Sequence, residues 1–324
     1  MAIYTDLDGD QLAALIAAYD VGTLVSAKGI AEGVSNSNWL IETRRNGGAS
    51  ARFILTMYER RIDTADLPFF LGLLDHLAAR DCPVPRTIHD AEGGLYRMIG
   101  DKAVALIEFL PGVSIEKPTA RQARSVGEAL ARNHLAVADF APSRANGLDL
   151  AGCAAMLEQC GTAALAEIEP TLPWIVAEET DYLFTMQDGG LPGGVVHTDL
   201  FPDNVLMLGD DVSGLIDFYF AATDSFAYDL AVTHAAWCFD PDGHSYRADV
   251  GEALVAGYAA VRPLSPQERG AMPHLLRRAC FRFIASRAED WIGTPPGAQV
   301  TRKDPLDFVR RLQFYRSNGA GLFA

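Results

Sequence analysis

The spacing of apolar residues changes along this 324-residue chain, and the change restricts it to a fold with two unlike halves. TLVSAKGIAEGVSNSNWLIET and ARFILTMYER are typical of strands in an antiparallel sheet, and the turn-like RRNGGAS separates them. ADLPFFLGLLDHLAARD then has a helical period, before TIHD, GLYRMI and KAVALIEFL alternate again as strands. Asp8 or Asp10 is a suitable cap for an earlier helix that we expect to end at Gly22.

From residue 119 onward the period is mostly helical. The exceptions are a polar loop and two short apolar stretches, residues 205–208 and 214–218, which we expect to pair as a hairpin. A single core rarely grows beyond about 250–300 residues. We therefore predict an α+β protein with an N-terminal lobe of antiparallel sheet and one helix, residues 1–110, and a mostly helical C-terminal lobe, residues 111–324.

Composition narrows the class of partner. The chain has 42 acidic and 27 basic residues and a net charge of −15, which argues against a nucleic-acid surface. Its five cysteines are scattered and form no C-x-x-C pair, so neither a zinc knuckle nor a disulfide framework is expected. The first residues are acidic where a signal peptide is basic, and no apolar run reaches the roughly 18 residues that span a membrane. We expect a cytoplasmic protein with no nucleic-acid or membrane partner.

The polar loop lies in GVVHTDLFPDNVLML, residues 194–208. Asn204 follows Asp199 by five positions, and pairing of VLML with SGLIDF would bring Asp217 alongside on the next strand. Phosphoryl transfer needs one carboxylate that orients the nucleophile, and amide and carboxylate oxygens that hold magnesium. Each of these residues alone also fits a solvated turn. Together, at this spacing, they favour catalysis.

This spacing resembles the kinase catalytic loop H-R-D-x-x-x-x-N, with IDF at the position of D-F-G. It is closer still to the aminoglycoside phosphotransferase and choline kinase-like family, in which H-x-D-x-x-x-x-N precedes I-D-[FW] and a later D-L-A, here YDLA. The resemblance implies a bilobal protein-kinase-like fold with ATP and Mg²⁺ as cofactors. It also implies that Asp199 is the base-like residue, that Asn204 and Asp217 are magnesium ligands, and that Asp229 braces the loop. We expect His197 to be part of the loop scaffold.

The expected ATP-binding lobe has a weaker signature. Gly29 and Gly33 lie between two strands, where the backbone can approach a phosphate, although a plain hairpin turn would look the same. Relatives usually carry a lysine or arginine at the strand position of Thr56, so Lys28 or Arg60 is expected to supply the cation instead.

Two further contacts follow from the resemblance alone. Asp66 is the acidic group expected at the following helix. The backbone of Glu108 and Leu110, in LIEFLPG, is expected to bind adenine.

Stretches outside the kinase motifs point to an acceptor. KGIAEGVSNSNW, SGLIDFYFA, AWCFDPDG and KDPLDFVRRLQF resemble the homoserine kinases of this family, over residues 1 to about 315. The resemblance implies ATP-dependent phosphorylation of L-homoserine, a step of threonine biosynthesis. Two departures, Ala235 and the stretch ASRAEDW, leave open another small hydroxyl acceptor such as an amino alcohol, a choline-like compound or an aminoglycoside. A non-catalytic nucleotide-binding protein is disfavoured by the intact polar motif.

Homoserine carries a carboxylate, for which a guanidinium is a suitable partner. Arg282 and Arg287, in FRFIASRAEDW, are the candidates, although arginines on helix surfaces are more often solvated. Tyr219 and Trp237 are expected to wall the acceptor pocket, with core packing as the alternative.

Overall fold

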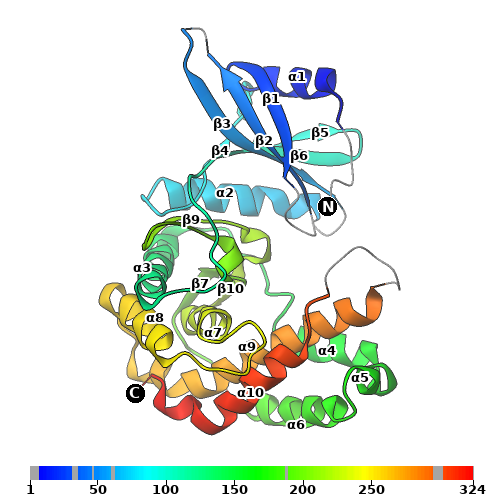
Figure 1. The fold of residues 1–324 in the computed structure, drawn as a ribbon, viewed down its shortest axis with the longest axis vertical. Helices are drawn as coiled ribbons and strands as arrows, with labels where there is room; N and C mark the ends of the chain where they lie inside the picture. The colour runs from blue at the N-terminus through cyan, green and yellow to red at the C-terminus, as the bar shows by residue number, and fades with distance from the viewer. Residues whose placement is uncertain are drawn as a thin grey trace. The chain divides into compact units, whose positions relative to one another are not determined.

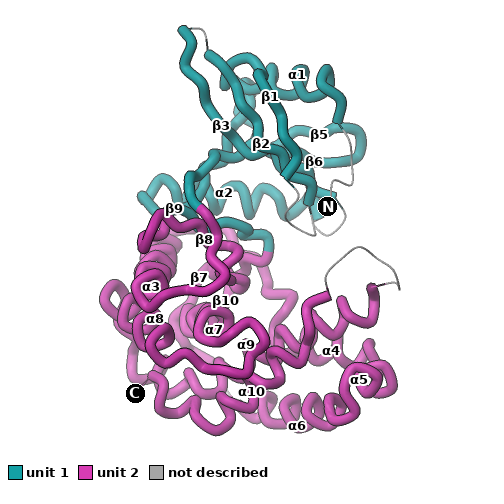
Figure 2. The backbone as a smooth tube through the Cα atoms, in the orientation of Figure 1, with its two compact units in different colours: residues 1–112, 213–219 teal, residues 113–212, 220–324 magenta. Residues whose placement is uncertain are grey.

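The computed structural model describes residues 7–30, 36–45, 47–59, 63–186, 189–294 and 302–323. The chain divides into two compact units, coloured teal and magenta in Figure 2. Unit 1 is Met1–Gly112 with Ser213–Tyr219, and unit 2 is Val113–Val212 with Phe220–Ala324. The segment Ser213–Tyr219 therefore belongs to the N-terminal unit, although the sequence prediction placed everything after residue 110 in the second lobe.

The described part of unit 1 contains a six-stranded antiparallel sheet (Figure 1). Its order is β1-β2-β3-β6-β4, and β5 pairs with β6. The elements are α1 (Gly9–Ala17), β1 (Thr23–Ile30), β2 (Asn36–Arg44), β3 (Ser50–Tyr58), the 3₁₀ turn η1 (Thr64–Asp66), α2 (Leu67–Ala78), β4 (Thr87–Ile88), β5 (Arg97–Ile99) and β6 (Lys102–Glu108). The expected strand–helix–strand order is confirmed.

The two faces of this sheet bury different side chains, because successive residues of a strand point to opposite faces. One face, with Trp39, Leu55 and Val104, packs with the apolar residues of α1. The other face, with Tyr58 and Ala105, packs with Leu67 and Leu71 of α2. The central strands β3 and β6 therefore lie between two apolar layers, whereas β1 at the edge is largely exposed.

Individual residues at the start of unit 1 determine where helix α1 and strand β1 begin. Asp8 caps α1, and its carboxylate accepts a hydrogen bond from the Gln11 backbone N–H while the Gln11 side chain bonds back to Asp8. The helix ends at Ala17, earlier than predicted. Gly22, expected to end it, instead has a φ of +98° at the entry to β1, and a Cβ there would lie 2.6 Å from the Arg44 carbonyl oxygen.

Unit 2 is mostly helical, as predicted, and none of the described helices is both long and apolar enough to cross a bilayer. Two short sheets interrupt the helices: β7 pairs antiparallel with β10, and β8 pairs with β9. The β7–β10 pair was not predicted. The remaining elements of the chain, of which β9 and η4 have residues in both units, are α3 (Ala120–Ala136), η2 (Val137–Asp139), α4 (Leu150–Cys160), α5 (Thr162–Ile168), α6 (Leu172–Thr185), β7 (Gly193–Val196), η3 (Pro202–Asn204), β8 (Val205–Leu208), β9 (Asp211–Leu215), η4 (Phe218–Phe220), β10 (Ala222–Ser225), α7 (Phe226–Trp237), α8 (Ala248–Val261), α9 (Pro266–Gly293), α10 (Leu306–Asn318) and η5 (Gly319–Gly321).

The predicted strand at residues 214–218 is wrong in its bounds. Gly209, with a φ of +67°, and Asp210 form a two-residue turn, so the second strand starts at Asp211. It ends at Leu215, and Asp217 follows the strand instead of lying on it.

Helices α3 and α8 are in unusually close contact because each presents a glycine to the other. A Cβ at Gly127 would lie 2.1 Å from the Leu254 carbonyl oxygen, and one at Gly257 would lie 2.1 Å from the Arg124 carbonyl oxygen. Both neighbours are backbone atoms, which cannot rotate away. The helix spacing in unit 2 therefore depends on these two glycines.

We expect Gly127→Ala and Gly257→Ala each to lower the free energy of unfolding by about 1–3 kcal/mol or more, because the helices must separate. Gly270→Ala is the matched control, since a Cβ at this position of α9 would meet nothing within 4 Å. It should be neutral or stabilising by up to about 1 kcal/mol. Urea unfolding of the three variants measures the difference, and equal effects would contradict the close packing.

Helix α7 is buried along its whole length, with α3, α8 and α9 around it (Figure 1). Its His234 is fully buried, and its Nδ1 lies 2.7 Å from the Tyr315 hydroxyl oxygen. Burial lowers the pKa of His234 to about 3. The imidazole is therefore neutral in the folded protein at neutral pH.

This lowered pKa makes stability depend on pH. Below the ordinary histidine pKa of about 6.5 the unfolded chain takes up a proton that folded His234 refuses, so stability falls as the pH decreases toward 3. Between pH 6 and pH 4 we expect the parent to lose about 2 kcal/mol more than His234→Gln. Urea unfolding at both pH values measures this, and parallel losses in the two proteins would contradict it.

Candidate functional site

The polar loop begins directly after β7 and is held by Asp229 of α7. The Asp229 carboxylate accepts hydrogen bonds from the backbone N–H groups of His197, at 2.9 Å, and Thr198, at 2.7 Å. Thr198 has a φ of +61°, and its hydroxyl donates to the Phe220 carbonyl oxygen at 2.9 Å. These bonds confirm that Asp229 braces the loop, and they fix a backbone conformation that a non-glycine residue rarely adopts.

Asp229 is itself fully buried and paired with His134 of α3. The His134 Nε2 lies 2.9 Å from its Oδ2, and Nδ1 lies 2.7 Å from the Tyr258 hydroxyl oxygen. Burial alone would raise the pKa of Asp229, but the hydrogen bonds from His134 and the loop backbone lower it below its usual value. The carboxylate therefore stays ionised. His134 was not predicted as part of the site, because no motif marks it.

Asp199 and Asn204 come together within the loop. The Asp199 N–H donates to His197 Nδ1 at 3.2 Å, which confirms the expected scaffold role of this histidine. The Asn204 Nδ2 donates to the Asp199 carbonyl oxygen at 2.8 Å and lies 3.3 Å from Oδ2. Since the amide nitrogen faces Asp199, the amide oxygen faces away, and such an oxygen is a suitable Mg²⁺ ligand.

The Asp199 carboxylate also contacts a cation. Arg282 Nη1 lies 3.1 Å from Asp199 Oδ1, and the side chain of Arg282 is only 4% exposed. Burial raises the pKa of Asp199 above its usual value, and the guanidinium opposes this. Unit 2 thus places Asp199, Asn204 and Arg282 in one cluster.

The other two expected acceptor residues of unit 2 are engaged elsewhere. Trp237 is fully buried, and its Nε1 donates to the Leu200 carbonyl oxygen at 2.8 Å, so it supports the loop. Arg287 Nη1 donates to Asp307 Oδ2 at 2.8 Å and to the Asp304 carbonyl oxygen at 2.9 Å, which fastens the start of α10 to α9. Direct binding of the acceptor by either residue stays a prediction.

In unit 1, Asp217 occupies a special backbone position. Its φ is +64° and its side chain is exposed. Two residues later, the Tyr219 hydroxyl lies 2.9 Å from that of Tyr58, and the two rings meet edge to face. Burial raises the pKa of both tyrosines. Tyr219 is thus packed against β3, and its contact with an acceptor stays a prediction.

The register of the sheet shows which residues lie on the same face as Thr56. Thr56 donates to Asn38 Oδ1 at 2.8 Å. Lys28 lies opposite Leu40, two positions from Asn38, so Lys28 and Thr56 share one face of the sheet, where Lys28 is exposed. Glu59, which follows β3, forms a half-buried ion pair with Lys102.

This Glu59–Lys102 pair belongs to the other face by strand alternation, because Thr56 lies opposite Ala105. The choice between Lys28 and Arg60 as the phosphate-binding cation of the Thr56 face stays open. Gly29 lies opposite Trp39 in β1. Gly33 and Arg60 lie outside the described residues.

Three predicted nucleotide contacts lie at ends of elements in unit 1. Asp66 ends η1, directly before α2. The Glu108 N–H already donates to the Arg86 carbonyl oxygen at 2.9 Å, whereas Leu110 follows the end of β6 and is half-buried. Their roles in nucleotide binding stay predictions.

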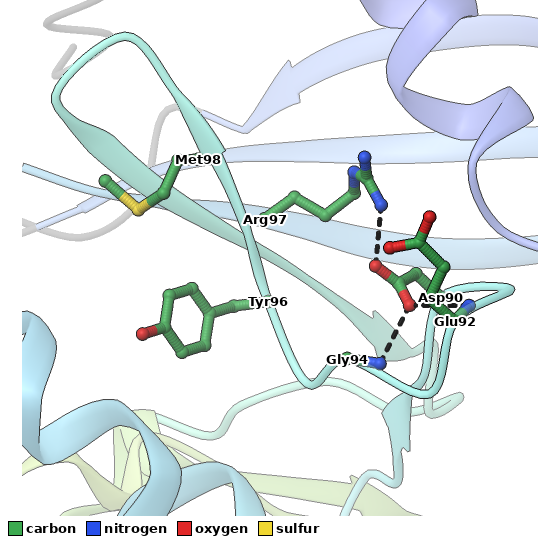
Figure 3. Close-up of a pocket in the computed structure, with 6 residues that line it drawn as sticks. All are labelled: Asp90, Glu92, Gly94, Tyr96, Arg97 and Met98. Atoms are coloured by element: carbon green, nitrogen blue, oxygen red, sulfur yellow. Dashed lines mark hydrogen bonds and ion pairs between the residues drawn. The ribbon is translucent and has the colours of Figure 1, made fainter.

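A pocket of about 520 Å³ in unit 1 contains none of these residues (Figure 3). Its main charged group, Asp90, accepts hydrogen bonds from Arg97 Nη1 at 2.7 Å and from the N–H groups of Gly94, at 2.8 Å, and Glu92, at 3.0 Å. These bonds close the turn before β5, so this carboxylate is used within the fold. We assign no ligand to the pocket.

Comparison with known proteins agrees with this geometry. Residues 26–264 match the phosphotransferase enzyme family. The fold is shared with amicoumacin kinase, solved with AMP-PNP and Ca²⁺, at a TM-score of 0.68 and 14% identity, covering 97% of this chain and 95% of that one. It is also shared with spectinomycin phosphotransferase, solved with ADP, at a TM-score of 0.68 and 12% identity, covering 98% of this chain and 97% of that one. The chain therefore belongs to the phosphotransferase enzyme family and has its kinase-like fold.

Full-length relatives narrow the class further. The chain is 46% identical to the homoserine kinase of Xanthobacter autotrophicus, over 98% of this chain and 97% of that protein. It is 48% identical to the homoserine kinase of Rhizobium rhizogenes, over 98% of this chain and 96% of that protein. The resemblance predicted from the sequence is thereby confirmed.

Proposed function

We propose that this protein transfers the γ-phosphoryl group of ATP to the hydroxyl of L-homoserine. The observation that carries the proposal is identity of 46–48% with homoserine kinases along nearly the whole chain. The hydroxyl oxygen bonds to the γ-phosphorus, the bond from that phosphorus to the β–γ bridging oxygen breaks, and ADP leaves. The hydroxyl proton passes to Asp199 and then to solvent.

The proposed metal is Mg²⁺, which supplies neutralisation of phosphate charge when bound. Asn204 and Asp217 would hold it through hard oxygen ligands. The described residues contain no cluster of three or more His, Cys, Asp and Glu side chains suited to a metal. Nucleotide contacts are proposed at Lys28, Gly29, Gly33, Thr56, Asp66, Glu108 and Leu110.

The acceptor site is proposed beside Asp199, with Tyr219 and Trp237 as walls. An arginine, Arg282 or Arg287, would bind the carboxylate of homoserine. Of the two, only Arg282 contacts Asp199, while Arg287 is paired with Asp307. We place the reaction in threonine biosynthesis and in the cytoplasm.

The direct test is a set of ADP-release assays with homoserine, choline, ethanolamine, 3-aminopropanol and kanamycin. We expect kcat/KM for homoserine to exceed that for each other acceptor by about a hundredfold or more, because charged groups left unpaired by the wrong ligand are costly. Product analysis should find O-phosphohomoserine. A higher kcat/KM for another acceptor would contradict the assignment of homoserine while leaving the kinase assignment intact.

Asp217→Asn tests the proposed metal ligand, and asparagine tolerates the positive φ at this position. We expect kcat to fall by about a thousandfold or more, since a ligand charge is lost, and folding to survive because the side chain is exposed. Mg²⁺-dependent ATP binding, measured by calorimetry, should weaken in parallel. Asp210→Asn, in the turn of the same hairpin, is the control and should behave like the parent. Near-parental activity of Asp217→Asn would contradict the metal assignment.

A further inference from the structure

Arg282 of α9 contacts a carboxylate of the catalytic loop. Its Nη1 lies 3.1 Å from the carboxylate of Asp199, the residue at the centre of the proposed reaction. The contact joins the middle of α9 to the catalytic loop. Both residues belong to unit 2.

The guanidinium of Arg282 is held in place by aromatic rings. Its central carbon lies 3.9 Å from the centre of the Phe283 ring and 5.3 Å from that of Phe220. Its Nε is buried and has no hydrogen-bond partner. Leaving a buried donor unpaired is unfavourable, but Arg311 of α10 also has an unpaired Nε, so this atom alone does not distinguish Arg282.

Three other arginines of α9 each pair with one carboxylate, whereas Arg269 donates to the Leu264 carbonyl oxygen. Arg277 pairs with Glu179 of α6 at 2.7 Å, Arg278 pairs with Asp224 of β10 at 2.8 Å, and Arg287 pairs with Asp307 of α10 at 2.8 Å. These three pairs join structural elements. By the same pattern, the carboxylate assigned to Arg282 is that of Asp199.

The pairing also suits the chemistry at Asp199. Arg282 contacts Oδ1, while the Asn204 amide lies 3.3 Å from Oδ2, so both carboxylate oxygens have a fixed neighbour. A carboxylate fixed in this way presents its remaining lone pairs in one direction. A rigid group at the reacting hydroxyl accelerates a reaction through orientation.

We propose that Arg282 is a positioning residue, which fixes the Asp199 carboxylate for the acceptor hydroxyl and does not bind the acceptor's own carboxylate. The inference rests on the proposed function, since it assigns Asp199 a role in phosphoryl transfer. It predicts that loss of Arg282 slows the chemical step with any acceptor. It also predicts that acceptor affinity is kept.

The test compares Arg282→Met, which keeps bulk without charge, with Arg282→Lys, which keeps the charge. We expect Arg282→Met to lower kcat by about tenfold or more while KM for homoserine and for ATP changes less than about threefold. Arg282→Lys should recover part of the lost kcat. A rise in KM for homoserine with kcat unchanged would identify Arg282 as the carboxylate ligand and overturn the proposal, and so would parental kcat in both variants.

Arg278→Met is the matched control, one helical turn earlier on α9 and similarly buried in an ion pair. It should lower the melting temperature as Arg282→Met does, yet leave kcat of the folded enzyme unchanged. If Arg282→Met does not fold, Arg282→Lys and Arg282→Gln are compared, and equal kcat in these two would overturn the proposal. Parental turnover of homoserine tests the proposed function separately, and the Arg282 effect is measured on whichever acceptor the parent phosphorylates.

Discussion

The hydrogen bonds of the buried Asp229 carboxylate hold the catalytic loop of unit 2 against α3 and α7. A charge with no exposure persists only where hydrogen bonds and an opposite dipole or charge replace water, and His134 and two loop N–H groups do so here. His134 comes from α3 and bonds Tyr258 of α8. The glycine contacts that bring α3 and α8 together therefore also place the groups that hold the catalytic loop.

What the sequence predicted well was local. Alternation identified the strands of unit 1, because successive residues point to opposite faces and at least one face packs in an apolar cluster. The loop residues Asp199 and Asn204 are five positions apart, so their spacing alone brings them into contact. Asp229 was reached by resemblance, through the YDLA stretch, and the hydrogen bonds agree with that assignment.

What the sequence did not predict depends on contacts across long separations. His134 lies in a helix without any motif, 95 positions before Asp229, and only packing brings the two together. The β7 and β10 strands are four residues each, too short for their period to stand out. Both bounds of β9 were misplaced: a two-residue turn sets where the strand begins, and the positive φ of Asp217 is incompatible with a strand that continues through it.

The arginines of α9 show why residue type alone does not assign a role. Arg277, Arg278, Arg282 and Arg287 are all largely buried, and each pairs with a carboxylate from a different part of unit 2. In a protein with a net charge of −15, such a helix gathers scattered acidic groups and ties their elements together. Three of these carboxylates belong to helices or a strand, and one belongs to the catalytic loop. The same helix therefore stabilises the fold and orients the site, and only the partner of each arginine distinguishes the two roles.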